Sequence, residues 1–347
     1  MKKLAYALIA IAGILALLIL AESILIPLVF GVVVWFLGKS FKKLVERIPY
    51  VKKKLPGVVV NILVFVLLVV LIGTLSRLIT NSIDNLLVSY ESYEANIKHI
   101  VEKLNAQFHV DIYKSVEQQL EGFDYGSMLT NIANSISGVF SNLIIILVYA
   151  AFMFSEESSF KNKLVKMFPN EEEYERSSGI LNKIGTSFSD YIRLKTYVSL
   201  LTGIVGYVFL LIMGVDSPFF WALLMFLLNY IPTIGSLVAT IFPAIFSLLQ
   251  FGEYTPFLII LIGLGIIEWI IGNVIEPKLM GNSLNLSPLV TILALIVWGQ
   301  IWGITGMLLS TPITVIMVIV FSQFDNTRNI AILLSQNGEV TSLAKKE

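Results

Sequence analysis

The sequence predicts an all-α polytopic membrane protein with about six full spans and two broken re-entrant hairpins, which form an inverted repeat near the C-terminus. Of its 347 residues, 56% are hydrophobic and 14% are charged, and the mean hydropathy is +0.83. Soluble domains carry about 25% charged residues, so this composition is typical of a membrane protein. Several apolar runs are long enough to cross a bilayer. Two longer apolar segments are interrupted near their middle by polar and helix-breaking residues.

Composition also excludes several kinds of function. The formal net charge of zero argues against a nucleic-acid partner. The chain has no cysteine, which excludes disulfides, thiol nucleophiles and thiolate metal sites. Because His99 and His109 lie in a polar stretch without a metal-like cluster, neither a metal nor a cofactor is expected. No nucleotide-binding loop or hydrolase motif is found, so we expect no enzyme, and an ion or solute gradient as the energy source.

Residues 1–79 are predicted to form three spans and a basic loop. The first apolar run, Leu4 to Leu20, exceeds the usual core of a signal peptide and lacks a cleavage motif, so we expect a retained span. Ile24 to Leu37 follows after a short turn. The stretch from Lys39 to Lys54 holds seven Lys/Arg and one Glu, which predicts a cytoplasmic loop and a cytoplasmic N-terminus. Gly57 to Arg77 then crosses outward.

Residues 80–136 are predicted to be an extracytoplasmic amphipathic helical segment. Thr80 to Ile136 holds three Lys and eight Asp/Glu, which suits the outer face. Apolar residues recur there at alternating steps of four and three, as in a coiled-coil seam. The seam comprises Ile79, Ile83, Leu86, Tyr90, Tyr93, Ile97, Ile100 and Leu104. It can pack within its own subunit or against another copy, and an exposed seam predicts a homo-oligomer.

Residues 137–196 are predicted to contain a fourth span and a cytoplasmic linker. Ser137 to Phe154 returns the chain to the cytoplasm. Ser155 to Thr196 holds seven Lys/Arg and seven Asp/Glu. Apolar residues in its second half recur at helical spacing, which predicts an amphipathic helix at the inner surface that runs into the fifth span.

Residues 197–321 are predicted to form the transport core, as two units of one span and one broken segment. The spans are Tyr197 to Met213 and Phe257 to Ile275, and the broken segments are Ser217 to Gln250 and Ser287 to Phe321. Each broken segment begins with Ser-Pro and exceeds the roughly 20 residues of one span, so it is either a long kinked helix or a hairpin. Its interrupting residues favour the hairpin. They are Asn229, Pro232, Thr233 and Gly235 in the first segment and Gln300, Gly303, Thr305 and Gly306 in the second.

The two units are expected to have opposite orientations in the membrane. Counting crossings from a cytoplasmic N-terminus, the first hairpin enters from outside and the second from inside, which leaves residues 322–347 as a cytoplasmic tail. Broken segments at matching places of an inverted repeat point to a transporter's binding site near the bilayer midplane. We therefore expect the tips, near Ile231 to Gly235 and Gln300 to Gly306, to line the substrate path.

Glu268 is the one carboxylate well inside an apolar span. A buried carboxylate is costly in a membrane and by default marks an ion or proton path. Glu276 follows eight residues later, with Gly272 midway on the same broad face and Asn273 nearby, so Glu268, Asn273 and Glu276 are candidate coupling residues. The alternative for Glu268 is a structural hydrogen bond, and the alternative for Glu276 is a helix-capping role.

Three stretches resemble the autoinducer-2 exporter (AI-2E) family of bacterial permeases. They are YIRLKTYVSLLTGIVGY (Tyr191 to Tyr207), WALLMFLLNYIPTIGS (Trp221 to Ser236) and NVIEPKLMGNSLNLSPLVTILALIVWGQIWGITGMLLSTP (Asn273 to Pro312). The resemblance implies a multi-pass transporter of the bacterial inner membrane. Some members are linked to export of autoinducer-2 and others to exchange of sodium or lithium for protons. The matched positions, which are mainly architectural in the family, are Pro232, Gly235, Glu276, Pro277, Gly281, Pro288, Gly303, Gly306 and Pro312.

These observations lead to one main hypothesis and two alternatives. The main hypothesis is a secondary transporter that lies in the lipid bilayer and exports a small polar solute, similar to autoinducer-2, across the inner membrane. The first alternative is a Na⁺(Li⁺)/H⁺ antiporter in which Glu268 carries the cation or proton. The second is a membrane scaffold without transport activity, suggested by the outer heptad seam and the inner amphipathic helix.

Overall fold

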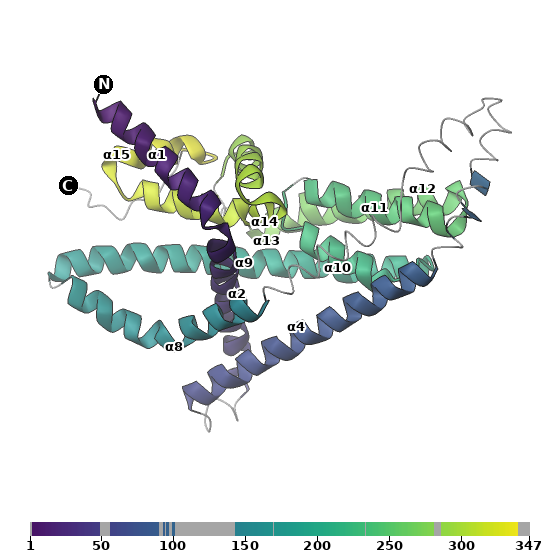
Figure 1. The fold of residues 1–347 in the computed structure, drawn as a ribbon, viewed down its shortest axis with the longest axis horizontal. Coiled ribbons are helices and arrows are strands. Elements are labelled where there is room, and N and C mark those ends of the chain that lie inside the picture. The colour runs from purple at the N-terminus through teal and green to yellow at the C-terminus, as the bar shows by residue number, and fades with distance from the viewer. Residues whose placement is uncertain are drawn as a thin grey trace. The chain divides into compact units, whose positions relative to one another are not determined.

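The computed structural model describes residues 2–48, 56–89, 93, 95–96, 99–100, 143–168, 170–232, 234–280 and 286–338, and the regular structure in these ranges is helical (Figure 1). This confirms the all-α prediction. Among the described residues, six helical stretches are long and apolar enough to cross a membrane. They are α2 (Glu22–Val45), α4 (Gly57–Val88), α9 (Glu171–Ile212), α11 (Ile234–Phe251), the run through α12 (Tyr254–Ile270), η1 (Ile271–Ile275) and α13 (Glu276–Met280), and α14 (Pro288–Ser322).

The number six agrees with the predicted number of spans, but the members of the set differ. Two expected spans, α1 (Lys2–Leu20) and α8 (Leu143–Met167), are not among the six. The second half of α8 carries Glu156, Glu157 and Lys163, which lowers its hydropathy. In their place stand α11 and α14, which belong to the two broken segments.

The chain divides into two compact units. The first comprises Met1–Val69, Asn142–Lys195 and Met280–Glu347, and the second comprises Val70–Ser141 and Thr196–Leu279. Helices α4 and α9 contribute to both. The predicted segment boundaries at residues 79/80 and 196/197 fall inside these two helices.

In the first unit, α2 packs closely on α8 and α9. A Cβ at Gly31 would lie 2.8 Å from the Cβ of Tyr149, so only glycine permits this approach of α2 to α8. Phe36 of α2 also stacks on Phe188 of α9, with ring centroids 5.0 Å apart. At the end of α2, Lys39 forms a 2.7 Å ion pair with Glu157 of α8. The basic end of α2 is thereby fixed to the charged half of α8.

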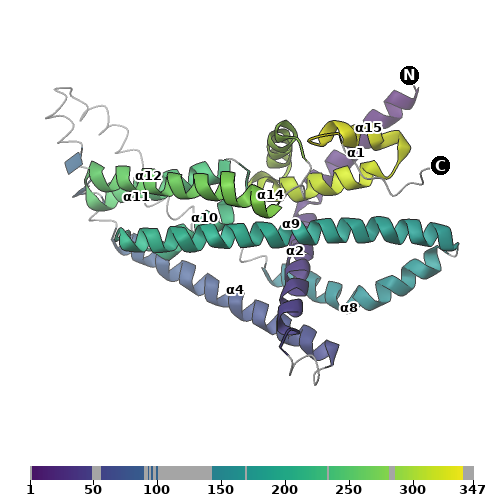
Figure 2. The same cartoon turned by 180° about the vertical axis from the view of Figure 1, so that it is seen from behind.

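Helix α14 is two arms joined by a sharp break. Trp302 and Gly303 have non-helical backbone angles, and a Cβ on Gly306 would overlap the carbonyl oxygen of Trp298. Gly306 and Trp298 are eight positions apart in the sequence. In a straight helix they would be separated by about 12 Å along the axis, because each residue adds about 1.5 Å. The second segment therefore folds back on itself near its predicted tip, and its arms, olive and yellow in Figures 1 and 2, run in different directions.

The open end of this hairpin is held by α15 (Asp325–Leu334). Leu286, just before the first arm, packs with Val315 and Val318 of the second arm and Ala331 of α15. The backbone N–H of Ser287 also donates to the carbonyl of Leu334 at 3.1 Å. The start of the first arm therefore lies beside the second arm and α15, so the chain folds back on itself, while a re-entrant position in the bilayer stays a prediction.

The first broken segment also reverses direction. Its arms are α10 (Pro218–Leu228) and α11, which pack against each other and on α12. A Cβ on Gly235 would overlap the carbonyl oxygen of Leu228, seven residues earlier. Proline at the first position of α10 and of α14 suits a helix start, because no N–H is needed there. Both segments thus share a Ser-Pro start, a broken tip and a glycine that lets the second arm contact the first.

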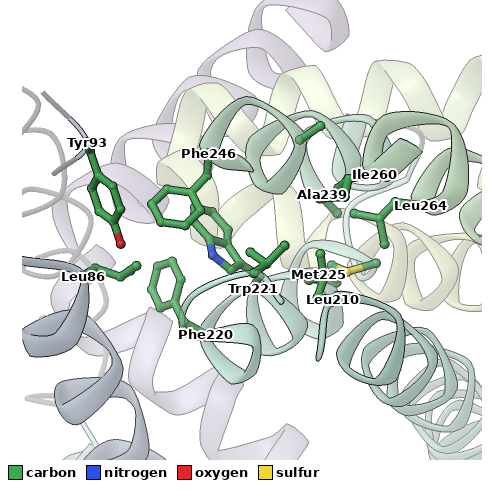
Figure 3. Packing of buried hydrophobic residues seen from close by; sticks show 12 residues of the cluster. Leu86, Tyr93, Leu210, Phe220, Trp221, Met225, Ala239, Phe246, Ile260 and Leu264 are labelled. Atoms are coloured by element: carbon green, nitrogen blue, oxygen red, sulfur yellow. The ribbon is translucent and has the colours of Figure 1, made fainter. Parts of the chain in front are cut away.

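An apolar core fills the second unit (Figure 3). Trp221 and Phe246 lie together, with ring centroids 4.9 Å apart, and Tyr93 meets Phe246 edge-on at 5.2 Å. Toward the other end of the core lie Met225 of α10 and Leu264 of α12. The core thus joins the first hairpin to α12 and to the chain that follows α4.

The heptad seam packs within the chain at its described positions. Leu86 and Tyr93 are almost fully buried in the core of the second unit, Ile83 packs against it, and Ile79 and Ile100 are also buried. The sequence pattern was correct in predicting a contact face, but the exposed face assumed for an oligomer is wrong here, because α10, α11 and α12 supply the partner. Tyr90, Ile97 and Leu104 lie outside the described residues. The oligomeric state stays a prediction.

Hydrogen bonds close the open end of the first hairpin. The side chain of Gln250 accepts from the backbone N–H of Asp216 at 2.7 Å and donates to the carbonyl of Gly214 at 2.8 Å. The Asn96 amide donates to the carbonyls of Leu249 and Gln250. The Tyr93 hydroxyl donates to Asp216 at 2.8 Å, and burial together with this bond raises the pKa of Tyr93, which keeps it a neutral donor.

Replacing Gln250 by methionine should loosen this closure while keeping the volume of the side chain. Two hydrogen bonds to backbone groups are lost, and each contributes roughly 0.5–1.5 kcal/mol net, so we expect a destabilisation of about 1–2 kcal/mol at this partly exposed position. Thermal unfolding of the purified protein in detergent measures it. A melting temperature equal to that of the unaltered protein would show that the apolar core alone closes the hairpin.

Candidate functional site

The buried carboxylate lies on the inner face of α12. Ile260, Leu264 and Glu268 follow one another at steps of four, so they share one face of the helix, and all three are buried. Ile260 and Leu264 belong to the core of the second unit, and Glu268 is 7% exposed. The neighbouring Trp269 is 62% exposed and lies on the outer face. The prediction that Glu268 lies in an interior is confirmed by this placement, while its role stays a prediction.

A π-helical turn directly follows Glu268. Residues Ile271–Ile275 form η1, whose hydrogen bonds span five residues instead of four, before α13 resumes the α-helical form at Glu276. Such turns are rare and occur frequently at functional sites. No pattern in the amino-acid sequence predicted this turn.

The predicted coupling residues around the π-helical turn differ in exposure. Gly272 and Asn273 are exposed, and the Asn273 amide donates back to the carbonyl of Trp269 at 3.1 Å. Glu276 is half-buried. The expected common face of Glu268, Gly272 and Glu276 stays a prediction, although the three residues differ in exposure. Only Glu268 of this set belongs to the interior.

A buried cluster of polar groups lies where the first hairpin breaks. Asn229 ends α10 and is 7% exposed, and its amide donates to the hydroxyls of Ser199 at 3.2 Å and Thr202 at 3.4 Å. The adjacent Tyr230 shares a 2.7 Å hydrogen bond with Thr196. Four hydroxyls and one amide thus meet between α9 and the tip of the hairpin. We call these five residues the hydroxyl cluster.

Asn229 was predicted as a site residue, but its partners on α9 were missed. Ser199 and Thr202 have no exposed surface, although both are polar. Lys195, four residues before Ser199 on the same face of α9, is only 6% exposed. A buried lysine in an apolar helix is rare and by default marks a functional position. The sequence does contain a signal, since Lys195, Ser199 and Thr202 recur at helical spacing. It was missed because residues up to Thr196 were assigned to a surface linker.

The other predicted tip residues of the first hairpin surround the same break. Pro232 is half-buried within the non-helical turn, and Gly235 is buried at the start of α11. Thr233 lies outside the described residues. The predicted tip from Ile231 to Gly235 therefore agrees with the described break.

At the second tip, the predicted residues differ in their surroundings. Gln300 and Gly303 are exposed, Thr305 is half-buried and Gly306 is buried against the first arm. The buried aromatic residue between them is Trp302, which was not singled out as a site residue. Gly281, a position of the family motif, lies outside the described residues.

No group of three or more metal-binding side chains occurs in the described part of the chain. The described side chains at these sites offer hydrogen bonding at the hydroxyl cluster and the ionisable groups of Glu268 and Lys195. Such groups can bind a polar solute or a monovalent cation inside an otherwise apolar protein.

Comparisons with known proteins identify the family of this chain. Residues 8–326 match the model of the AI-2E family transporters. The chain is 32% identical over 321 residues to the AI-2 transport protein TqsA of Escherichia coli, covering 91% of this chain and 90% of that protein. It is 30% identical to putative transport proteins of Borreliella burgdorferi, over 91% of this chain and 85% of the relative, and of Haemophilus influenzae, over 94% of each. With a match over nearly its whole length, this multi-pass membrane protein belongs to the AI-2E family of transporters.

Proposed function

We propose that the protein is a secondary transporter that exports a small polar solute, similar to autoinducer-2, across the bacterial inner membrane. The observation that carries this proposal is the hydroxyl cluster, because three buried polar side chains (Ser199, Thr202 and Asn229) and two half-buried ones (Thr196 and Tyr230) adjoin a broken helix inside an apolar protein. Broken helices at membrane depth are tolerated where they line a cavity, and transporter sites are built from them. The name of the Escherichia coli relative adds support for an autoinducer-2-like solute.

The test uses the purified protein in proteoliposomes that contain autoinducer-2. Asn229→Leu keeps the approximate size of the side chain and removes the amide that links α10 to Ser199 and Thr202. Loss of a buried hydrogen-bonding group should lower the transport rate at subsaturating solute by about tenfold or more. The matched control is Asn329→Leu, at an exposed asparagine of α15, which should transport normally. Equal transport by both variants would remove the hydroxyl cluster from the substrate path.

The proposal includes an orientation in the membrane. The basic stretch from Lys39 to Lys54 supports cytoplasmic termini, a first hairpin that enters from outside and a second that enters from inside. Because the chain has no native cysteine, single cysteines can be labelled without background. Cysteine at Glu253 should react with an impermeant maleimide from outside and cysteine at Phe324 only from inside. Labelling of position 253 from inside contradicts this orientation.

A second candidate function is exchange of a monovalent cation for protons, favoured by the burial of Glu268. Addition of sodium or lithium to proteoliposomes should then release protons on the opposite side, independently of any organic solute. The heptad seam gives less support to the scaffold alternative, because Leu86 and Tyr93 of the seam pack within the chain.

A further inference from the structure

Trp302 has an unusual position at the break of α14. Its backbone lies at φ −127° and ψ 18°, and the next residue, Gly303, lies at φ 59° and ψ −142°. The second conformation is essentially restricted to glycine, so this dipeptide determines the direction of the chain at the tip. The Trp302 side chain is nevertheless 7% exposed, and its ring lies 5.5 Å from that of Trp298. The Trp302 side chain is therefore well packed although the backbone around it is irregular.

The Trp302 side chain also contacts the first helix, α1. The indole N–H of Trp302 donates to the backbone carbonyl of Leu18 at 3.0 Å, across 284 positions of sequence. Leu18 belongs to the last turn of α1, which ends at Leu20. Carbonyls in the last turn of a helix lack partners within that helix. One hydrogen bond thus satisfies both a buried donor at the tip and an acceptor at the end of α1.

We propose that Trp302 is the positioning residue of the second tip, and that it docks this tip on the last turn of α1 in one state of the transport cycle. The N-terminal pair α1 and α2 then takes part in the movement of the hairpin instead of serving only as a membrane anchor. The inference rests on the proposed transport function, because a tip that must move is a requirement of transport. A single neutral hydrogen bond shifts the equilibrium between the docked and undocked positions by roughly five- to tenfold. A shift of this size favours the docked position and can still be reversed in every transport cycle.

The test measures access to the tip directly. Thr305→Cys places the only cysteine of the chain at a half-buried position three residues after Trp302. Its alkylation rate is followed with a water-soluble maleimide in the purified protein in nanodiscs. Trp302→Phe keeps an aromatic ring but removes the N–H, so it should raise the alkylation rate about five- to tenfold. Trp298→Phe is the matched control, since it removes an indole four residues away and leaves the bond to Leu18, and its rate should stay within about twofold.

Gly303→Ala provides a second variant that keeps the indole. No atom lies within 4 Å of the added Cβ, so the substitution acts only through the backbone conformation and should likewise undock the tip and raise the rate. Equal rates in all backgrounds, or the same increase with Trp298→Phe, would overturn the proposal.

A transport measurement separates positioning from a general structural role. Trp302→Phe should change the maximum transport rate at an unchanged half-saturating solute concentration, with a melting temperature close to that of the unaltered protein. A loss of melting temperature that accounts for the whole change in rate would overturn the positioning role. Since alkylation does not require transport, faster labelling in a protein that moves no solute would refute the proposed function and leave the docking contact standing.

Discussion

Gly306→Ala is expected to prevent the second hairpin from closing and to abolish transport through loss of the fold. A Cβ at Gly306 would overlap the carbonyl oxygen of Trp298 and lie 2.6 Å from its carbonyl carbon. Gly235 meets Leu228 in the same way, with the carbonyl carbon at 2.7 Å, so Gly235→Ala should have the same effect on the first hairpin. Overpacking costs about 1–3 kcal/mol where side chains can adjust, and here the obstacle is backbone, so we expect about 3 kcal/mol or more.

Thermal unfolding and the yield of folded protein measure this effect. The matched control is Gly265→Ala in α12, where the added Cβ meets no atom within 4 Å and alanine favours the helix. A Gly306→Ala protein that melts like the Gly265→Ala protein would show that the two arms can separate without loss of stability.

These two contacts explain why the broken segments could be predicted from the sequence. Pro218 and Pro288 mark the helix starts, and the glycines after each break permit the return of the chain, so both signals are local. Local signals of this kind are readable without a structure. The direction from which each hairpin enters the membrane depends on the bilayer and remains a prediction.

The heptad seam, which begins in the second half of α4, was only partly predictable, for a different reason. Heptad spacing identifies a contact face, but it carries no information about which partner covers that face. Leu86 and Tyr93 pack on the core around Trp221 and Phe246, a contact between segments far apart in the sequence. Tertiary packing decides such a question.

The candidate site was predictable where charge is conspicuous. Glu268 stands out as a carboxylate within an apolar run, whereas Ser199 and Thr202 are tolerated in any membrane helix and become informative only when Asn229 meets them. Lys195 was missed because a continuous helix, α9, joins the charged linker to the span without a break. The π-helical turn after Glu268 depends on hydrogen-bond geometry, which the pattern of apolar residues does not reveal.

Glu268→Gln is the substitution with the largest expected effect on transport at an intact fold. Glu268 is buried beside Ile260 and Leu264 on the face of α12 that contacts the core, directly before the π-helical turn. Glutamine keeps the shape of the side chain and its capacity for hydrogen bonding but cannot titrate. Removing a costly buried charge should leave the melting temperature unchanged or raise it. If Glu268 carries a proton or cation, transport should fall by roughly a hundredfold, the low end of what proton-transfer groups contribute, and lose its dependence on pH.

Two further substitutions on the same helical run serve as comparisons. Glu253→Gln, at the exposed start of α12, should transport like the unaltered protein. Glu276→Gln, at the half-buried start of α13, should act mainly on folding, because that residue lies at a helix boundary. Transport rates and a pH profile equal to those of the unaltered protein, in well-folded Glu268→Gln, would assign Glu268 a structural hydrogen-bonding role. Solute export through the hydroxyl cluster would then have to draw on the solute gradient or on a different coupling group, for which the buried Lys195 is the next position to change.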